Sequence, residues 1–257
     1  MTASSGMKSQ QKMVDTIANN IANVNTGGFK RSSLHFRSLL YQTFAEPGAA
    51  TSQSGMNPTG LQIGSGVEIA GSRKSFRQGD LEPTGAPFDV AINGQGFFRV
   101  LLPNGDFRYT RDGHFSRDGN GMVVTADGYP VETFPNISAD VIDISIAEDG
   151  TITTRNSESD TGTIAGQMQL FRFANPEGLK AQGGNNFSET ASSGTAQQQV
   201  PGTTGTGRLV HRHVERSNVE VVDELVGLIM AQRNYEVNSR AVRASDEMLQ
   251  QVNQMIR

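Results

Sequence analysis

Oxygen-bearing side chains cluster in the middle of this 257-residue sequence, where four of them could in principle bind a metal ion. Asp112, Asp118, Asn120 and Asp127 all lie in or beside short turns that contain Gly. Calcium prefers carboxylate and amide oxygens, but the best-known calcium loop spaces its acids, its Gly and its final Glu differently. The spacing therefore favours ordinary hairpin turns over a calcium site.

Two histidines offer a second possible metal site. His211 and His213 flank Arg212 and would lie on one face of a strand, since side chains alternate along a strand. Only His35 and His114 remain in the chain to complete the ligand set. Two ligands make an incomplete site, so we expect no bound metal.

Catalytic patterns are weak. Glu82 and Asp89 could act as the paired carboxylates of a glycosidase, although any β protein supplies two acids somewhere. The segment 94–96, Gly-Gln-Gly, lacks the third Gly of a dinucleotide-binding loop and continues as strand-like residues. Cysteine is absent, which excludes thiol catalysis and thiolate metal sites. The sequence predicts neither an enzyme nor a cofactor.

Composition excludes further classes. The formal charge of -4 and the pI of about 5.6 do not favour nucleic-acid binding, which normally needs a basic patch. The 29 glycines and 35% hydrophobic residues are typical of a turn-rich β protein. No apolar run approaches the roughly 20 residues of a membrane helix, so we expect no membrane embedding. The first residues lack the apolar core of a cleaved signal peptide, so any export would use another route.

The N-terminal residues predict a helix with one apolar seam. Its apolar residues recur at spacings of seven, three, four and three, as in a heptad pattern. They are Met7, Val14, Ile17, Ile21 and Val24. Asn23, Asn25 and the pair Gly27-Gly28 are expected to end the helix, because Asn and Gly tolerate a left-handed C-cap.

A longer helix is expected at the C-terminus, from about Asn218 to Met255. Ser217 and Glu220 have the spacing of a capping box, which predicts the start of this helix. Apolar residues then recur seven apart, at Val221, Leu228, Tyr235, Val242, Leu249 and Ile256. Such a helix would be roughly 57 Å long, well beyond the length of the N-terminal helix.

The long helix needs partners, and two alternatives remain open for it. Both helices could simply pair within one monomer, or the unpaired length could contact neighbouring subunits. Tyr235, with the polar residues around it, likewise fits either a core position or an interface, where Tyr and Arg are favoured. The interface residues that we expect are Met7, Val14, Ile17, Asn20, Ile21, Asn23, Val24, Val221, Leu225, Leu228, Gln232, Arg233, Tyr235, Asn238, Val242 and Leu249.

Between the helices the sequence alternates as in β-strands. Short apolar runs are separated by Asn-Gly and Asp-Gly turns from about residue 87 onwards, while residues 46–60 form a Gly-, Ser- and Pro-rich loop. The prediction is an α+β fold in which terminal N- and C-helices form a coiled-coil-like domain and a mainly antiparallel β domain is inserted between them. Residues 1–44 plus 215–257 form the helical domain, 45–84 an extended stretch and 85–214 the β domain.

Four segments carry a family resemblance. They are 18–30, ANNIANVNTGGFK; 231–239, AQRNYEVNS; 109–115, YTRDGHF; and 94–98, GQGFF. Each resembles a signature of the bacterial flagellar rod and hook proteins, and together they span nearly the whole chain. The family usually carries a few more residues before the segment that matches the start of this chain. Residues 46–64 resemble the stretch that distinguishes the distal rod from the hook.

The resemblance implies a structural protein. Terminal helices would pack into the inner tube of a hollow helical homo-oligomer, with the β domain outside. Such a subunit would be exported by the flagellar type III apparatus without a cleaved signal peptide. It would contact proximal rod proteins and hook or junction proteins, cross the periplasm to the outer membrane inside the P and L rings, and transmit torque. Proximal rod or hook subunits are the nearest alternatives, and a secreted β-rich binding module is a more distant one.

Overall fold

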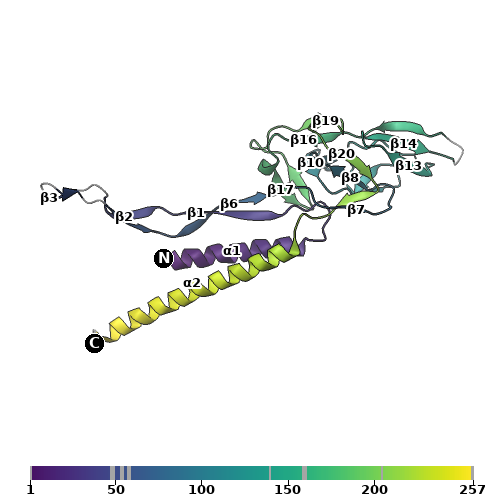
Figure 1. Ribbon diagram of the computed structural model, residues 1–257. Coiled ribbons are helices and arrows are strands. Elements are labelled where there is room, and N and C mark those ends of the chain that lie inside the picture. Colours follow the sequence, from purple (N-terminus) through teal and green to yellow (C-terminus); the bar gives the residue numbers. More distant parts are fainter. Residues whose placement is uncertain are drawn as a thin grey trace. The chain divides into compact units, whose positions relative to one another are not determined.

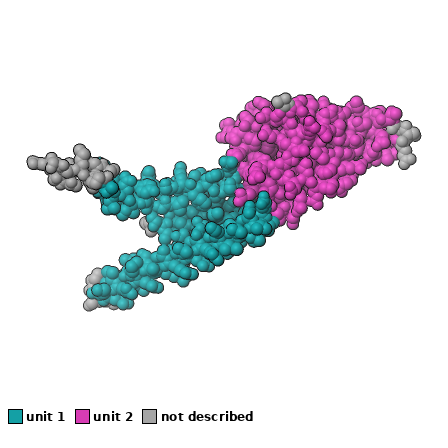
Figure 2. All heavy atoms as spheres, in the orientation of Figure 1, with its two compact units in different colours: residues 1–22, 32–73, 220–257 teal, residues 23–31, 74–219 magenta. Residues whose placement is uncertain are grey.

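The computed structural model describes residues 2–46, 50–52, 55–56, 59–138, 140–157, 161–203 and 205–255. The chain divides into two compact units, shown in teal and magenta in Figure 2. Unit 1 comprises Met1–Ala22, Ser32–Arg73 and Glu220–Arg257, and unit 2 comprises Asn23–Arg31 and Lys74–Val219. The terminal helices and the antiparallel β region between them confirm the predicted α+β fold. The boundaries of the compact units differ from the expected domain limits. Those domain limits remain a prediction.

Unit 1 contains the helices α1 (Thr2–Ala22) and α2 (Val221–Met255), which pack side by side (Figure 1). The second helix begins at Val221 and not near Asn218, so the predicted start was wrong. Ser217 does not form the expected capping box, because its buried Oγ has no hydrogen-bond partner in the described chain. Instead, the backbone N–H of Glu224 donates to the carbonyl oxygen of Glu220 at 3.1 Å and closes the first turn.

Paired strands form the rest of unit 1. They are β1 (Ser32–Ser38), β2 (Tyr41–Ala45), β3 (Ala50–Ser52), β4 (Gly55–Met56), β5 (Leu61–Gly64) and β6 (Val67–Lys74). Strand β1 pairs with β6, β2 with β5 and β3 with β4, so the segment forms an extended two-stranded ribbon (Figure 1).

The sequence pattern did not reveal β1 and β2, because their side chains are mostly exposed and show no alternation. The expected loop at 46–60 contains β3 and β4. Its residues 47–49, 53–54 and 57–58 lie outside the described residues.

Unit 2 is built from the remaining strands and one short 3-10 helix, η1 (Pro176–Gly178). The strands are β7 (Leu81–Pro83), β8 (Val90–Asn93), β9 (Phe98–Leu101), β10 (Phe107–Thr110), β11 (Phe115–Arg117), β12 (Val123–Thr125), β13 (Asp143–Ile146), β14 (Thr151–Arg155), β15 (Thr163–Gln167), β16 (Leu170–Arg172), β17 (Lys180–Gly183), β18 (Asn186–Ser188), β19 (Gln197–Gln199), β20 (Arg208–His211) and β21 (His213–Glu215).

These strands form several small sheets. The largest has the order β17-β18-β10-β9, and a second has the order β13-β14-β15. The others are the pairs β11-β12, β16-β19, β20-β8 and β21-β7. The expected Asp-Gly turn between β13 and β14 is present, with Gly150 at a φ of 85° and the N–H of Thr151 bonded to Oδ1 of Asp149 at 3.0 Å.

Two hydrophobic clusters hold unit 2 together. The larger is mainly aliphatic and includes Val90, Ile92, Ile152 and Leu209, each no more than 1% exposed. The smaller is mainly aromatic, with edge-to-face ring contacts that are favourable for aromatic quadrupoles. Its buried members are Phe97, Tyr109, Phe171, Phe173, Leu179 and Phe187. Both described clusters lie in unit 2, so unit 1 depends mainly on its helix pair and ribbon.

Candidate assembly interface

The side-chain oxygens in the Gly-containing turns accept hydrogen bonds from neighbouring groups of the same turns. Oδ1 of Asp118 accepts the N–H groups of Asn120 at 2.9 Å and of Met122 at 2.8 Å. Oδ1 of Asp112 lies 2.7 Å from Nδ1 of His114, and this hydrogen bond raises the pKa of His114 above its ordinary value. In the described parts of the chain, no group of three or more His, Cys, Asp or Glu could hold a metal ion.

The residues considered for metal binding or catalysis have structural partners. Nε2 of His211 lies 2.8 Å from the Pro87 carbonyl oxygen, and Nδ1 of His213 lies 2.8 Å from that of His211. Asp89 accepts the Thr84 hydroxyl at 2.6 Å, while Glu82 forms a 3.5 Å ion pair with Arg216. These carboxylates therefore serve separate local contacts.

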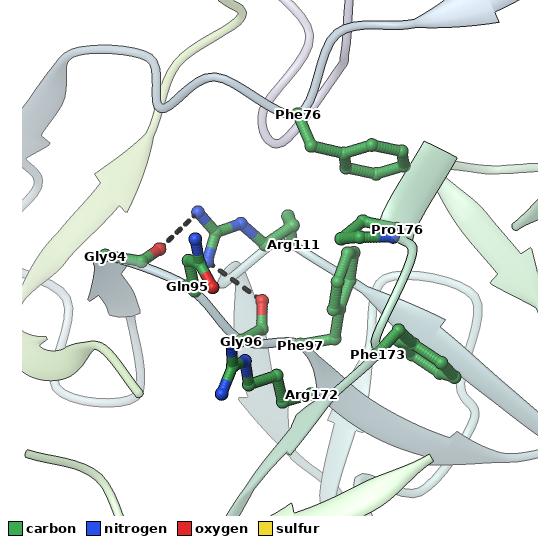
Figure 3. A pocket seen from close by; sticks show the side chains of 9 residues that line it. All are labelled: Phe76, Gly94, Gln95, Gly96, Phe97, Arg111, Arg172, Phe173 and Pro176. Atoms are coloured by element: carbon green, nitrogen blue, oxygen red, sulfur yellow. Dashed lines mark hydrogen bonds between the residues drawn. The ribbon is translucent and has the colours of Figure 1, made fainter. Parts of the chain in front are cut away.

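The Gly94-Gln95-Gly96 turn borders a cavity of about 90 Å³ in unit 2 (Figure 3). The carbonyl oxygens of Gly94 and Gly96 accept hydrogen bonds from the guanidinium of Arg111 at 2.8 and 2.9 Å. Phe76, Phe97 and Phe173 form much of the remaining wall. The glycines present carbonyl oxygens to Arg111, which is the opposite of the N–H groups that a phosphate loop presents.

A buried ion cluster beneath this turn was not foreseen from the sequence. Nζ of Lys30 lies 2.5 Å from Oε1 of Glu215, and Nε of Arg111 lies 3.1 Å from Oε2 of the same carboxylate. The N–H of Gly79 also donates to Oε1, at 2.9 Å. Burial lowers the pKa of Lys30 to about 8, while Glu215 opposes that shift. Lys30 and Arg111 both belong to the segments that carry the family resemblance. That membership was the one feature of the sequence that could have indicated the cluster.

The Gly-Gly pair of the first signature lies against the backbone of unit 2. Gly28 has a φ of 65°, and a Cβ there would lie 2.5 Å from the backbone nitrogen of Asp112. Its N–H donates to the Glu215 carbonyl oxygen at 2.8 Å. The Asn185 amide donates to the Gly27 carbonyl oxygen at 2.7 Å. This part of the signature is therefore built for close packing.

The expected interface residues, most of which lie on the helix pair of unit 1, fall at three levels of exposure. Ile17 and Asn20 are buried. The half-buried residues of the expected set are Met7, Val14, Ile21, Asn23, Val24, Leu228, Asn238 and Val242, of which Asn23 and Val24 belong to unit 2. The exposed ones are Val221, Leu225, Gln232, Arg233, Tyr235 and Leu249.

Exposed apolar side chains cover much of α2. The first three turns include Val226, Ile229 and Met230, which are 55%, 50% and 59% exposed. Sequence analysis did not single out these residues, because they lie beside the heptad stripe. The other large apolar residues exposed on α2 are Val221, Val222, Leu225, Tyr235, Val237, Met248, Leu249, Val252 and Met255. These exposed apolar side chains make this surface of α2 the candidate interaction site.

The ribbon of unit 1 exposes a second set of large apolar side chains. Leu40 is 89% exposed, and Phe44 is 63% exposed. Tyr41, Leu61 and Ile63 add to this set.

Neither helix is both long enough and apolar enough to cross a membrane, so far as the described residues extend.

Three protein-family descriptions match the sequence. Residues 1–30 match the flagella basal body rod protein family, and residues 91–154 match the D1 domain of the flagellar hook protein FlgE/F/G family. Residues 211–255 match the C-terminal part of the flagellar basal body rod FlgEFG protein family. The matched segments include α1, α2 and the β8–β14 region.

Full-length relatives are also similar. The chain is 45% identical over 252 residues to the flagellar basal-body rod protein FlgG of Borreliella burgdorferi, covering 96% of this chain and 94% of the relative. It is 43% identical over 255 residues to the protein of the same name from Caulobacter vibrioides, covering 99% and 97%. Identity to the Bacillus subtilis protein of that name is 39% over 253 residues, covering 96% and 95%.

Proposed function

This chain belongs to the family of bacterial flagellar basal-body rod proteins, and we propose that it forms the distal part of the rod. It is a structural subunit of the basal body and not an enzyme. In the proposed assembly, copies of the chain join through their terminal helices into a hollow helical tube. The tube transmits torque from the motor to the hook, and its mechanism is passive stiffness.

The apolar surface of α2 is the observation that carries this proposal. Helix α2 has 35 residues and α1 has 21, so α1 cannot cover the whole of its partner. Apolar residues remain exposed along both the first turns and the last turns of α2. A neighbouring copy of the chain is the proposed occupant, because repeated contacts of this kind that do not close into a ring generate a helical filament.

The ribbon is the proposed source of the distal-rod character. The ribbon overlaps the stretch 45–84, where it exposes Leu61 and Ile63, and it also exposes Leu40 and Phe44 before residue 45. Contacts of these side chains with neighbouring subunits would add a second interface outside the helices. Two interfaces per subunit resist bending and twisting better than one, as a straight drive shaft requires.

The proposed location and partners follow from the distal position. The subunit would lie in the rod between the periplasm and the outer membrane, after export through the flagellar type III apparatus without a cleaved signal peptide. Proximal rod proteins would lie below it and hook or junction proteins above it. The P and L rings would surround it.

Deletion of the gene, followed by electron microscopy of isolated basal bodies, tests the distal assignment. Rods that stop short of the outer rings and carry no hook are the expected result. Complete rods that lack only the hook would assign the chain to the hook side, and loss of the entire rod would assign it to the proximal side. Intact flagella would overturn the structural role altogether.

A further inference from the structure

Asn20 and Glu224 form a buried polar contact between α1 and α2. Each residue is only 1% exposed. Nδ2 of Asn20 donates to Oε2 of Glu224 at 3.2 Å and to the Ser32 carbonyl oxygen at 2.9 Å. Oδ1 of Asn20 accepts the Ser32 N–H at 3.0 Å. Asn20 is thus anchored to the start of β1 while it donates to a carboxylate on the other helix.

The helices keep one antiparallel register along their contact. A Cβ on Gly6 would lie 3.0 Å from Nδ2 of Asn238, and a Cβ on Gly227 would lie 3.4 Å from Cδ1 of Ile17. From Gly6 to Asn20 is fourteen residues, as is the return from Asn238 to Glu224. The three contacts therefore belong to a single alignment of the two helices.

Apolar packing alone discriminates weakly between this alignment and a shifted one. The buried residues in the described helices are Ser9, Ile17, Asn20, Glu224 and Ala231, of which only two are apolar. Leu228, Tyr235 and Val242 repeat every seven residues, so a shift of α1 by seven residues along α2 replaces one apolar side chain by another. That shift is about 10 Å at the rise of an α-helix.

The Asn20–Glu224 contact does discriminate between the observed alignment and the shifted one. After such a shift Asn20 would face Ala231, and Glu224 would lose the amide that donates to it. The opposite shift would place Asn20 beyond the start of α2. Removing a hydrogen-bond donor from a buried carboxylate is unfavourable, so the loss of the Asn20 amide disfavours the shifted alignment.

We propose that Asn20 and Glu224 determine the register in which α1 pairs with α2. Buried polar residues have this role in coiled coils, where they select one alignment at the expense of stability. The inference concerns pairing within one subunit, so it holds whether the subunit belongs to the distal rod or elsewhere in the basal body.

Distance measurement between two spin labels tests the register. The natural sequence has no cysteine, so cysteines introduced at the exposed positions Lys12 and Glu247 take the labels specifically. In this background Glu224→Gln keeps an oxygen acceptor for Asn20, whereas Glu224→Leu removes it. Glu236→Leu is the matched control, because the Glu236 side chain lies on the same helix and is 65% exposed.

The parent protein, E224Q and E236L are expected to give one narrow distance. E224L is expected to add a second population that is shorter by about 10 Å, as a seven-residue shift requires. Asn20→Ala removes the other half of the contact and should give the same second population. A single unshifted distance in both E224L and N20A would overturn the proposal, since Gly227 and Ile17 would then suffice. A broad distribution in the parent would also overturn it.

Discussion

At the scale of single residues, the signature segments stabilise unit 2 from inside. Lys30 and Arg111 come from two of these segments and both bind Glu215, whose side chain is fully buried. Two backbone groups also join this cluster: the N–H of Gly79 donates to Oε1 of Glu215, and the carbonyl oxygen of Arg77 accepts from Nζ of Lys30. A charged cluster with this many partners tolerates burial, because each charge has hydrogen-bonding groups around it.

Lys30 makes the stability of the protein depend on pH. Burial lowers the pKa of Lys30 from the ordinary 10.5 to about 8 in the folded protein, while Glu215 opposes this shift and Arg111 adds to it. Between these two pH values the unfolded chain keeps a proton that the folded chain has released, so the free energy of unfolding rises with pH. Below pH 8 both states keep the proton, and this contribution is constant.

Comparison of the wild type with Lys30→Met isolates this effect, because the other titrating groups are shared. The wild type should gain stability relative to K30M between pH 8 and 10, by at most about 1.4 kcal/mol per pH unit, with no relative change between pH 6 and 8. Urea unfolding at each pH measures the difference. A flat difference above pH 8 would mean that Lys30 keeps its ordinary pKa.

Gly28 is expected to tolerate no side chain. Gly28→Ala would meet the Asp112 backbone and strain a left-handed φ, so it should destabilise the protein by at least about 2 kcal/mol more than Gly85→Ala. Gly85 is the matched control, because it has a similar φ of 73° and nothing within 4 Å of an added Cβ. Both variants carry the left-handed penalty of about 1 kcal/mol. Equal losses in urea unfolding would show that close packing at Gly28 contributes nothing.

At the scale of elements, α2 has two surfaces with different roles. One surface contacts α1 and contains the buried Glu224 and Ala231. The other exposes apolar residues such as Val226 and Met230, which are 55% and 59% exposed. A change on the exposed surface should therefore alter assembly while the fold is kept.

The triple variant Val226→Ser, Ile229→Ser, Met230→Ser tests this separation. These side chains are half or more exposed, so the free energy of unfolding of the monomer should change by less than about 1 kcal/mol. Cells in which this variant replaces the wild type should lose motility and hooks. The control is Ile142→Ser with Ile164→Ser in unit 2, where the side chains are 70% and 74% exposed. Full motility of the triple variant would refute the proposed role of this surface.

At the scale of the whole molecule, the buried hydrophobic clusters and most of the exposed apolar side chains lie in different units. Both described hydrophobic clusters lie in unit 2. Unit 1 contains most of the exposed large apolar side chains, on α2 and on the ribbon. We therefore expect the β unit to stay folded whether or not the helices contact neighbouring copies.

Removal of the end of α2 is the matching test at this scale. The same alignment places Thr2 opposite Val242, so residues after Arg243 extend past α1. A chain that ends at Arg243 should unfold with a free energy within about 1 kcal/mol of the full chain, since Met248, Leu249 and Val252 are at least half exposed. Cells with only this chain should build no hook. Normal hooks would show that the end of α2 is dispensable for assembly.

Local pattern was sufficient for the main outline of the fold. Heptad spacing predicted both terminal helices, and Asn-Gly and Asp-Gly turns predicted a β region between them, because these signals depend on neighbouring residues alone. The pattern failed at Ser217, where the capping-box spacing is present but α2 begins later. It also failed at β1 and β2, whose exposed side chains do not alternate.

The candidate interface, too, could be predicted from the sequence only in part. The sequence by itself determined that a long apolar stripe runs along the last helix and that its partner is shorter. Only the tertiary structure decided which side of that stripe faces α1, and that Glu224 and Asn20 meet there. It alone brought Lys30, Arg111 and Glu215 together, because residues far apart in the chain become neighbours only when the backbone folds. Spacing along a sequence describes one element, whereas burial and pairing depend on what packs against it.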